Sequence, residues 1–257
     1  MNFIVVIPSY KRYKLIKTHT LRVLEDSDIP IKKIFIFVAN KTEYAEYIKE
    51  LTVNYHNNII IGKKGLKNQR NFISSYFPEN INILYLDDDL RSINKLTNYN
   101  KDNRTQNKLK KIHNLTKIIK DSFKHSIENK SYLWGVYPIN NAYFMFPKIT
   151  TDLRFITGPM YGIINRHNKK LRLTIDEKED TERTLQHFVM DNIVVRFNNI
   201  TIDTDYYKNK GGMQHLNTER KKDSLISANY LIKKYPTLTK LNLKKKNGIP
   251  EVKLINK

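Results

Sequence analysis

The sequence predicts a single α/β domain built on a mixed, mainly parallel sheet that is flanked by helices. Two observations lead to this fold class. Four short apolar runs alternate with three helical patterns within the first ninety residues, as expected when helices connect parallel strands. At 257 residues, of which 40% are hydrophobic, the chain is also long enough to bury one large core. In such folds ligands bind beyond the carboxyl ends of the strands.

The first half is expected to contain strands at 3–7, 31–40, 57–62 and 81–86, with helices at 11–25, 42–51 and 65–77 between them. The first strand, FIVVI, is apolar throughout, which is typical of a strand buried on both faces of a sheet, and Pro8 ends it. Thr42 is expected to cap the second helix. Gly65 opens the third helix, which is basic and has its apolar residues roughly on one face.

The alternation stops after Asp89. Residues 91–130 are predicted to form a basic insertion that is polar at first and then helical. Further strands are expected at 132–140, 152–164 and 191–203, with an acidic turn and a helix between the last two. We therefore expect one domain over 1–220, which includes the insertion, followed by a helix and a lysine-rich tail over 221–257.

The charge of the chain is strongly positive, with 46 Lys and Arg against 25 Asp and Glu and a formal net charge of +21. The basic residues are concentrated in 101–130, which has nine Lys and Arg against three acids, and in 233–257, which has eight lysines against Glu251 alone. Such clusters favour a polyanionic partner, either nucleic acid or an anionic membrane face. The alternative is a compositional drift toward lysine.

The chain has no cysteine, which excludes disulfides, thiolate zinc sites and a cysteine nucleophile. No apolar stretch approaches the roughly 20 residues that span a bilayer. The N-terminus has a short apolar run followed by basic residues, which is the reverse of a signal peptide. We expect an intracellular protein that is not secreted and has no membrane span, and we infer no obligate protein partner.

The stretch NINILYLDDDL, residues 80–90, places three carboxylates after an apolar run. Tyr85 to Asp88 could form the Tyr-x-Asp-Asp hairpin of a template-directed polymerase, and Asp87 to Asp89 could form the Asp-x-Asp of a nucleotide-sugar transferase. A polymerase needs a second metal-binding aspartate on a neighbouring upstream strand. The strands at 3–7 and 31–40 carry none, so the polymerase interpretation is rejected. A solvated loop tip remains the structural alternative.

Three features together resemble a glycosyltransferase of the GT-A fold: the first strand ending in Pro8-Ser9-Tyr10, the Gly65-opened helix, and the Asp-x-Asp after an apolar strand. The resemblance implies that 1–90 binds a nucleotide sugar and that 131–220 binds the acceptor. It implies a Mn²⁺ or Mg²⁺ ion on Asp87 and Asp89, since carboxylates suit a hard cation that neutralises a diphosphate leaving group. The implied donor-binding residues are Pro8, Ser9, Tyr10, Arg12, Gly65, Lys67, Asn68, Arg70, Asp87, Asp88, Lys210, Gly211 and Gly212. For Lys67 and Arg70 the alternative is a solvated helix face.

Two later segments are similar to parts of the same fold. TIDEKEDTE, at 174–182, carries Glu179-Asp180 before a helix, where many inverting members keep the general base. Asp180 is the expected base, with Glu179 next, for removing a proton from an acceptor hydroxyl; alternatively these acids only favour the helix N-terminus. Gly211-Gly212 would let backbone amides approach phosphate, with Lys210 adding charge. His215 is either a third metal ligand or a structural histidine.

The combination of KGLKNQRNFI, LYLDDDL, FITGPMYG, EDTER and KGGMQ looks most like the TET-associated glycosyltransferases, a group that includes the base J glucosyltransferase. This resemblance implies UDP-glucose as donor and a hydroxymethylated pyrimidine in DNA as acceptor. DNA would then be held by 101–130 and 233–257 through its phosphates. An extruded base could stack on Trp134, Tyr137 or Tyr161, although Trp134 fits the core better. A glycan or protein acceptor, and a DNA-binding module without activity, remain as alternatives.

Overall fold

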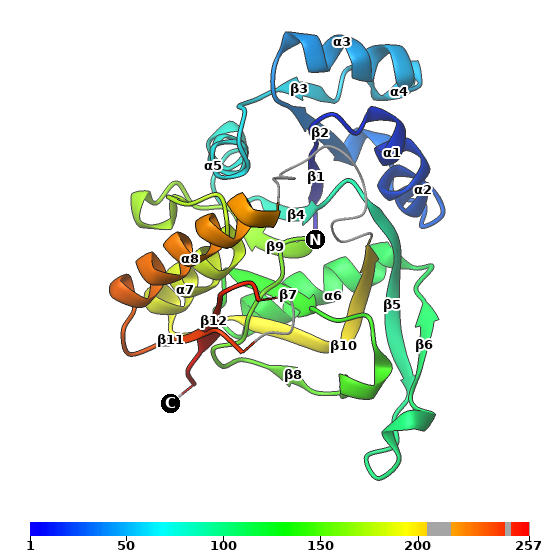
Figure 1. Ribbon diagram of the computed structural model, residues 1–257. Helices are drawn as coiled ribbons and strands as arrows, with labels where there is room; N and C mark the ends of the chain where they lie inside the picture. Colours follow the sequence, from blue (N-terminus) through cyan, green and yellow to red (C-terminus); the bar gives the residue numbers. More distant parts are fainter. Residues whose placement is uncertain (205–216, 245–247, 257) are drawn as a thin grey trace.

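The computed structural model describes residues 1–204, 217–244 and 248–256. Figure 1 shows one large twisted sheet with helices on both of its faces. Its strands, in spatial order, are β3-β2-β1-β4-β9-β7-β10-β5-β6, and β8 also pairs with β10. These strands are β1 (Ile4–Pro8), β2 (Ile34–Val38), β3 (Ile59–Ile61), β4 (Asn82–Leu86), β5 (Leu90–Asn98), β6 (Lys108–Lys111), β7 (Leu133–Tyr137), β8 (Ile149–Thr150), β9 (Met160–Ile164) and β10 (Val195–Thr204).

The helices are α1 (Tyr13–Thr18), α2 (Thr20–Glu25), α3 (Lys41–Glu50), α4 (Val53–His56), α5 (Leu66–Tyr76), α6 (Leu115–Glu128), α7 (Glu179–Asp191) and α8 (Asn217–Lys234). A second, two-stranded sheet pairs β11 (Thr239–Asn242) with β12 (Glu251–Leu254). No helix in the described part of the chain is long and apolar enough to cross a membrane.

The first ninety residues fold as the sequence predicts. β1 pairs in parallel with β2 and β4, and β2 pairs in parallel with β3. Two details differ. The helix expected over 11–25 is divided at His19 into α1 and α2. The cap of α3 is Asn40, whose side chain accepts a hydrogen bond from the backbone N–H of Glu43 at 2.9 Å, so the prediction of Thr42 as cap is wrong by two residues.

The segment 91–130 is only partly helical. α6 confirms the helix, but β5 and β6 form an antiparallel hairpin that was not predicted. β5 begins directly after Asp89 and pairs with β10, with Ile93 opposite Ile202. The burial along β5 does not alternate, because Leu90, Ile93 and Leu96 are the buried positions among polar neighbours. That spacing hid the strand from a search for period-two patterns.

The core has two main parts. One collects apolar side chains from α1, α2, α3 and α6 against one face of the sheet, and it contains Trp134. The other lies under α5 and α7 and contains Tyr85 and Tyr161. Trp134 and Tyr161 are each 1% exposed, so neither offers a free ring face to a base, and the expectation of Tyr161 as a stacking platform is wrong for this structure. Trp134 lies in the core, as the alternative interpretation has it.

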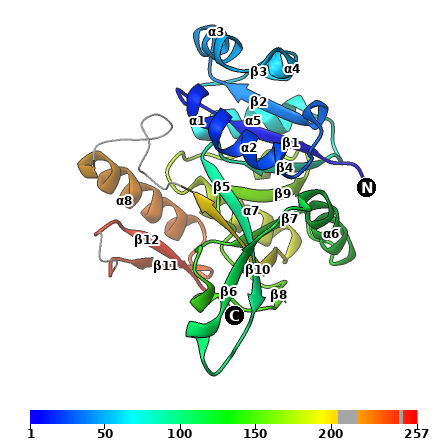
Figure 2. The same cartoon turned by 90° about the vertical axis from the view of Figure 1, so that its right-hand side faces the viewer.

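The end of the chain packs against the main domain rather than trailing from it. Leu231 of α8 is buried in a cluster with Leu153 and Leu185, and Val252 and Leu254 of β12 pack against that cluster. Figure 2 shows α8 beside the β11–β12 hairpin. The lysine-rich segment after Leu243 is therefore ordered over Glu251–Leu254, where it forms a strand.

Candidate active site

The acid triplet lies at the carboxyl ends of two neighbouring parallel strands, β1 and β4. Ser9, just after β1, donates a hydrogen bond to Asp88 at 2.5 Å and also contacts the Tyr47 hydroxyl. Arg12 bridges the other oxygen of Asp88, at 2.8 Å, and Asp89, at 3.1 Å. Asp88 is thus buried with both oxygens engaged. It joins the two strand ends instead of facing outward.

Asp87 begins the turn and is fixed by its backbone. Its N–H donates to the carbonyl of Pro159, and its carbonyl accepts from the Thr20 hydroxyl at 2.7 Å. The same hydroxyl accepts from the N–H of Leu90, so both ends of the triplet are tied to α2. The Asp87 side chain is 32% exposed, against 5% for Asp88. Asp89 is 10% exposed, so Asp87 is the most exposed carboxylate of the triplet.

Glu179 and Asp180 lie at the start of α7 and are reached from the triplet through Arg70 of α5. Arg70 contacts Asp87 at 3.4 Å and Glu179 at 3.1 Å. Arg183, one helical turn after Glu179, contacts its other oxygen at 2.7 Å. Glu179 is almost fully buried between two guanidinium groups, and each of its oxygens contacts one of them, so it serves as an ion-pair partner of the two arginines.

Asp180 has a different environment. It is half-buried, and it accepts a hydrogen bond from the backbone N–H of Thr181 at 2.8 Å. Burial, followed by the charge of Glu179, raises the pKa of Asp180 to about 6, although Arg183 opposes the shift. A carboxylate with this pKa is ionised at neutral pH and more basic than an ordinary aspartate, as a general base requires.

The segment around Gly158 lies between these groups. A β-carbon at Gly158 would be 3.6 Å from the Arg70 guanidinium and 3.7 Å from an Asp180 oxygen. The next residue, Pro159, holds Asp87 through its carbonyl. Gly158 and Pro159 therefore place Asp180 and Asp87 near one another at the carboxyl end of β4.

The other predicted residues are placed as follows. Gly65 has a φ of +90°, which favours glycine. Lys67 and Asn68 turn away from the triplet: Lys67 donates from its side chain to the carbonyl of Thr174, and Asn68 to that of Lys64. Pro8 ends β1. The Lys11 ammonium lies over the Tyr10 ring, 5.4 Å from the ring centroid. Lys210, Gly211, Gly212 and His215 lie outside the described residues.

Sequence reasoning did not find three residues that shape this site: Thr20, Tyr47 and Arg183. Arg183 had a usable signal, because residues four apart on a helix lie on one face and Glu179 precedes it by four. Thr20 and Tyr47 reach the site only through the packing of α2 and α3, which no local pattern reports.

The site fits a divalent cation on its charge. Among the described residues, the carboxylates of Asp87, Asp88, Asp89 and Glu179 contact three guanidinium groups. Asp180 adds a further carboxylate beside Glu179, so acids outnumber guanidinium groups here, which suits a divalent cation. No group of three or more acidic or histidine side chains with metal-binding geometry exists in the described ranges. Mg²⁺ commonly needs only one or two carboxylates, with water and substrate phosphates as its other ligands.

Solved structures share this architecture. S. aureus TarS 1–349 in complex with UDP-GlcNAc superimposes with a TM-score of 0.56 at 13% identity, over 90% of this chain and 67% of that one. The complex of TarS with UDP gives 0.51 at 13% identity, over 90% and 66%. The fold is that of the GT-A glycosyltransferases. The fold prediction is therefore confirmed.

Another TarS 1–349 structure is matched over 59% of its length, and full TarS over 44%, so the chain spans roughly half to two thirds of these neighbours. No protein-family model matches the sequence, and no curated protein matches it. The closer resemblance to the TET-associated family stays a prediction.

Proposed function

We propose that this protein is a metal-dependent glycosyltransferase that moves a sugar from a nucleotide donor to an acceptor hydroxyl. One observation carries the proposal: Arg70 links the acid triplet at the end of β4 to Glu179 at the start of α7, and Gly158 lies beside both Arg70 and the next residue of α7, Asp180. TarS, whose fold this chain shares, is bound to UDP-GlcNAc in its own structure.

Each group has a defined task in such a transfer. Asp87 and Asp89 are the proposed metal ligands, and the cation, when bound, supplies positive charge to the diphosphate leaving group. Arg12, which already contacts Asp88 and Asp89, orients that side of the turn. Glu179 holds Arg70 and Arg183 in place. Asp88 braces the turn against Ser9.

Asp180 takes the proton in the bond-making step. The acceptor O–H proton passes to the Asp180 carboxylate while the acceptor oxygen bonds to the anomeric carbon. The bond from that carbon to the diphosphate oxygen breaks, and its electron pair leaves with the nucleoside diphosphate. One displacement of this kind inverts the anomeric configuration.

We assign the acceptor to DNA carrying hydroxymethylated pyrimidines, and the donor to UDP-glucose, on the family resemblance. The β5–β6 hairpin supports a polyanionic acceptor, because it carries exposed cations and begins directly after Asp89. Its exposed cations include Lys95 and Lys110, which are opposite one another across the two strands. Like charges in that register cost stability, a cost that contact with phosphates would offset.

The test is transfer of labelled glucose from UDP-glucose, with Mn²⁺, to duplex DNA that contains 5-hydroxymethylpyrimidine. We expect labelled DNA with the unmodified protein and none with Asp89→Asn. The control Asp121→Asn removes the same charge from the exposed face of α6 and is expected to stay active. Labelling of a glycan in place of DNA would overturn the assignment of DNA as the acceptor. Tight, salt-dependent DNA binding without donor turnover would overturn the proposal that the protein is a glycosyltransferase.

A further inference from the structure

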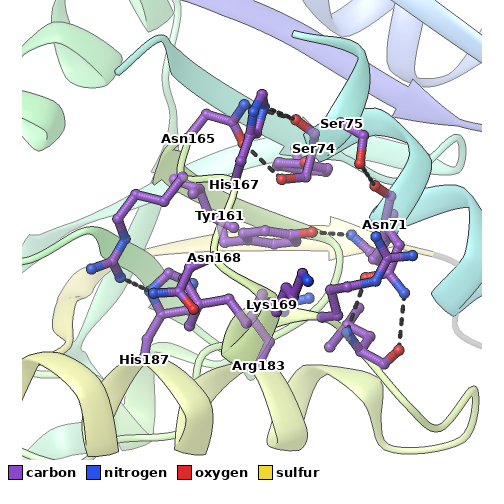
Figure 3. Close-up of a pocket in the computed structure, with 17 residues that line it drawn as sticks. Asn71, Ser74, Ser75, Tyr161, Asn165, His167, Asn168, Lys169, Arg183 and His187 are labelled. Atoms are coloured by element: carbon purple, nitrogen blue, oxygen red, sulfur yellow. Dashed lines mark hydrogen bonds between the residues drawn. The ribbon is translucent and has the colours of Figure 1, made fainter. Parts of the chain in front are cut away.

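A separate cavity lies between α5 and α7, over the face of β9. Its volume is about 290 Å³. Figure 3 shows Tyr161 crossing it, with Ser74 and Ser75 from α5 on one side and Arg183 and His187 from α7 on the other. The loop 165–173 closes it. Because β9 runs antiparallel to β4, this loop follows the end of β9 that is far from the acid triplet.

The lining of this cavity is basic. It includes five cationic side chains, Arg70, Arg166, Lys169, Arg172 and Arg183, and two histidines, but no aspartate or glutamate among the described residues. Arg166 is paired with Asp191, and Arg70 and Arg183 share Glu179, all from outside the lining. Lys169 and Arg172 have no ion pair in the described part of the chain.

Several donors remain for a ligand. The Nε atoms of Arg166 and Arg183 are buried without a hydrogen-bond partner, and a buried donor left unpaired costs free energy. His187 accepts from Arg166 on Nδ1, so its proton is assigned to Nε2. Burial lowers the pKa of His187, which keeps the ring neutral. A cavity lined by cations and N–H donors, without an acidic side chain in its described lining, suits an oxyanion as its ligand.

We propose that this cavity binds a small phosphate-bearing molecule through Arg166, Lys169, Arg172 and Arg183. The volume is at the lower end of ligand pockets, which fits a compact molecule and not a nucleic-acid duplex. The site is distinct from the donor site, since Arg166, Lys169 and Arg172 contact none of the acid triplet. Guanidinium groups and phosphate form paired, charge-assisted hydrogen bonds.

Occupation of the cavity would reach the active site through shared side chains, a step that rests on the proposed function. Arg70 and Arg183 line the cavity and also hold Glu179. A bound phosphate competes with Glu179 for these guanidinium groups. We therefore expect phosphate to inhibit sugar transfer without competing with the donor, in keeping with reciprocal coupling between two sites.

The binding test uses inorganic phosphate, titrated by calorimetry into the 257-residue protein with saturating UDP present to fill the donor site. Lys169→Gln and Arg172→Gln are each expected to weaken phosphate binding about tenfold or more, the loss of one charge-assisted contact. The matched control is Lys170→Gln, the exposed neighbour on the same loop that does not line the cavity. It is expected to bind like the unmodified protein.

The outcomes separate this site from the proposed function. An equal loss in Lys170→Gln, or no saturable binding, would overturn the cavity as a phosphate site. A parallel loss of DNA affinity in Lys169→Gln would assign the loop to a nucleic-acid surface instead. UDP binding, measured in the same calorimeter, reports on the donor site alone, so its absence would count against the transferase and leave the phosphate result intact. Inhibition by phosphate that is competitive with the donor would overturn the coupling.

Discussion

Replacing Asp180 with asparagine is expected to remove activity and to increase stability. The pKa of Asp180 is raised to about 6, because burial and the charge of Glu179 both disfavour its ionised form. The asparagine keeps the shape and can still accept the hydrogen bond from Thr181 that the aspartate accepts. The substitution therefore removes the charge and the base, and little else.

The direction and the size of the stability change follow from the pKa of Asp180 in the folded protein and in the unfolded chain. In the unfolded chain an aspartate loses its proton near a pH of about 4, whereas the folded protein retains it until about pH 6. The folded state thus binds this proton more tightly, so the contribution of Asp180 to stability is full below pH 4 and is lost as pH rises through 6. The pKa of Asp180 is about two units higher in the folded protein than in the unfolded chain. At about 1.36 kcal/mol per unit, ionisation of Asp180 lowers the free energy of unfolding by about 3 kcal/mol at high pH. Asp180 is partly exposed, and solvent screening reduces this figure to about 1–3 kcal/mol.

The assay is urea unfolding of Asp180→Asn and the unmodified protein at a series of pH values. Equal stability is expected near pH 4, and a more stable variant at pH 8. Sugar transfer should fall by about 10²- to 10⁴-fold, and in the unmodified protein kcat/KM should rise with pH through about 6. Asp121→Asn, on the exposed face of α6, should change neither property. A variant that is destabilised equally at pH 4 and pH 8, or that stays active, would refute the reasoning.

Three further predictions concern other parts of the molecule. Gly62→Ala would place a β-carbon 2.0 Å from the Gln69 amide oxygen that accepts from the Lys63 N–H, so it should displace the Gln69 side chain, break that hydrogen bond and destabilise the protein by about 1–3 kcal/mol, measured by urea unfolding. Chelation by EDTA should abolish transfer and Mn²⁺ should restore it, whereas Asp89→Asn should need far more Mn²⁺ for the same rate. The double variant Lys95→Gln/Lys110→Gln should make the slope of log K for DNA binding against log salt concentration shallower by about two phosphate contacts. Its thermal stability should be equal to or slightly higher than that of the unmodified protein, because two like charges opposite one another are removed.

The parallel half of the fold could be predicted because its strands are buried on both faces and read as continuous apolar runs. FIVVI and NILYL are of this kind, and both form strands within a residue of the expected limits. The β5–β6 hairpin could not be predicted in the same way. It is at the edge of the sheet, where one strand has a single partner and charged side chains are favoured, so its sequence resembles a solvated segment.

Within the candidate site, the sequence located the acids but not what holds them. The acid triplet and Glu179-Asp180 could be found because unusual clusters of carboxylates stand out locally. Their partners depend on tertiary packing: the Thr20 hydroxyl binds the backbone on both sides of the triplet, and Tyr47 contacts Ser9 from α3. Neither residue differs in its local sequence from an ordinary helical position.

The burial of Arg70 could have been predicted from its position in the sequence. Leu66, Ile73 and Phe77 define the apolar stripe of α5, and Arg70 is four residues after Leu66 and three before Ile73, which places it on that stripe. A solvated helix face is therefore wrong for Arg70, and its side chain is 4% exposed. A buried guanidinium requires an acidic partner. An arginine on an apolar stripe, in a chain with few acids, thus points to the acid clusters at the ends of two other elements, and it does contact both of them.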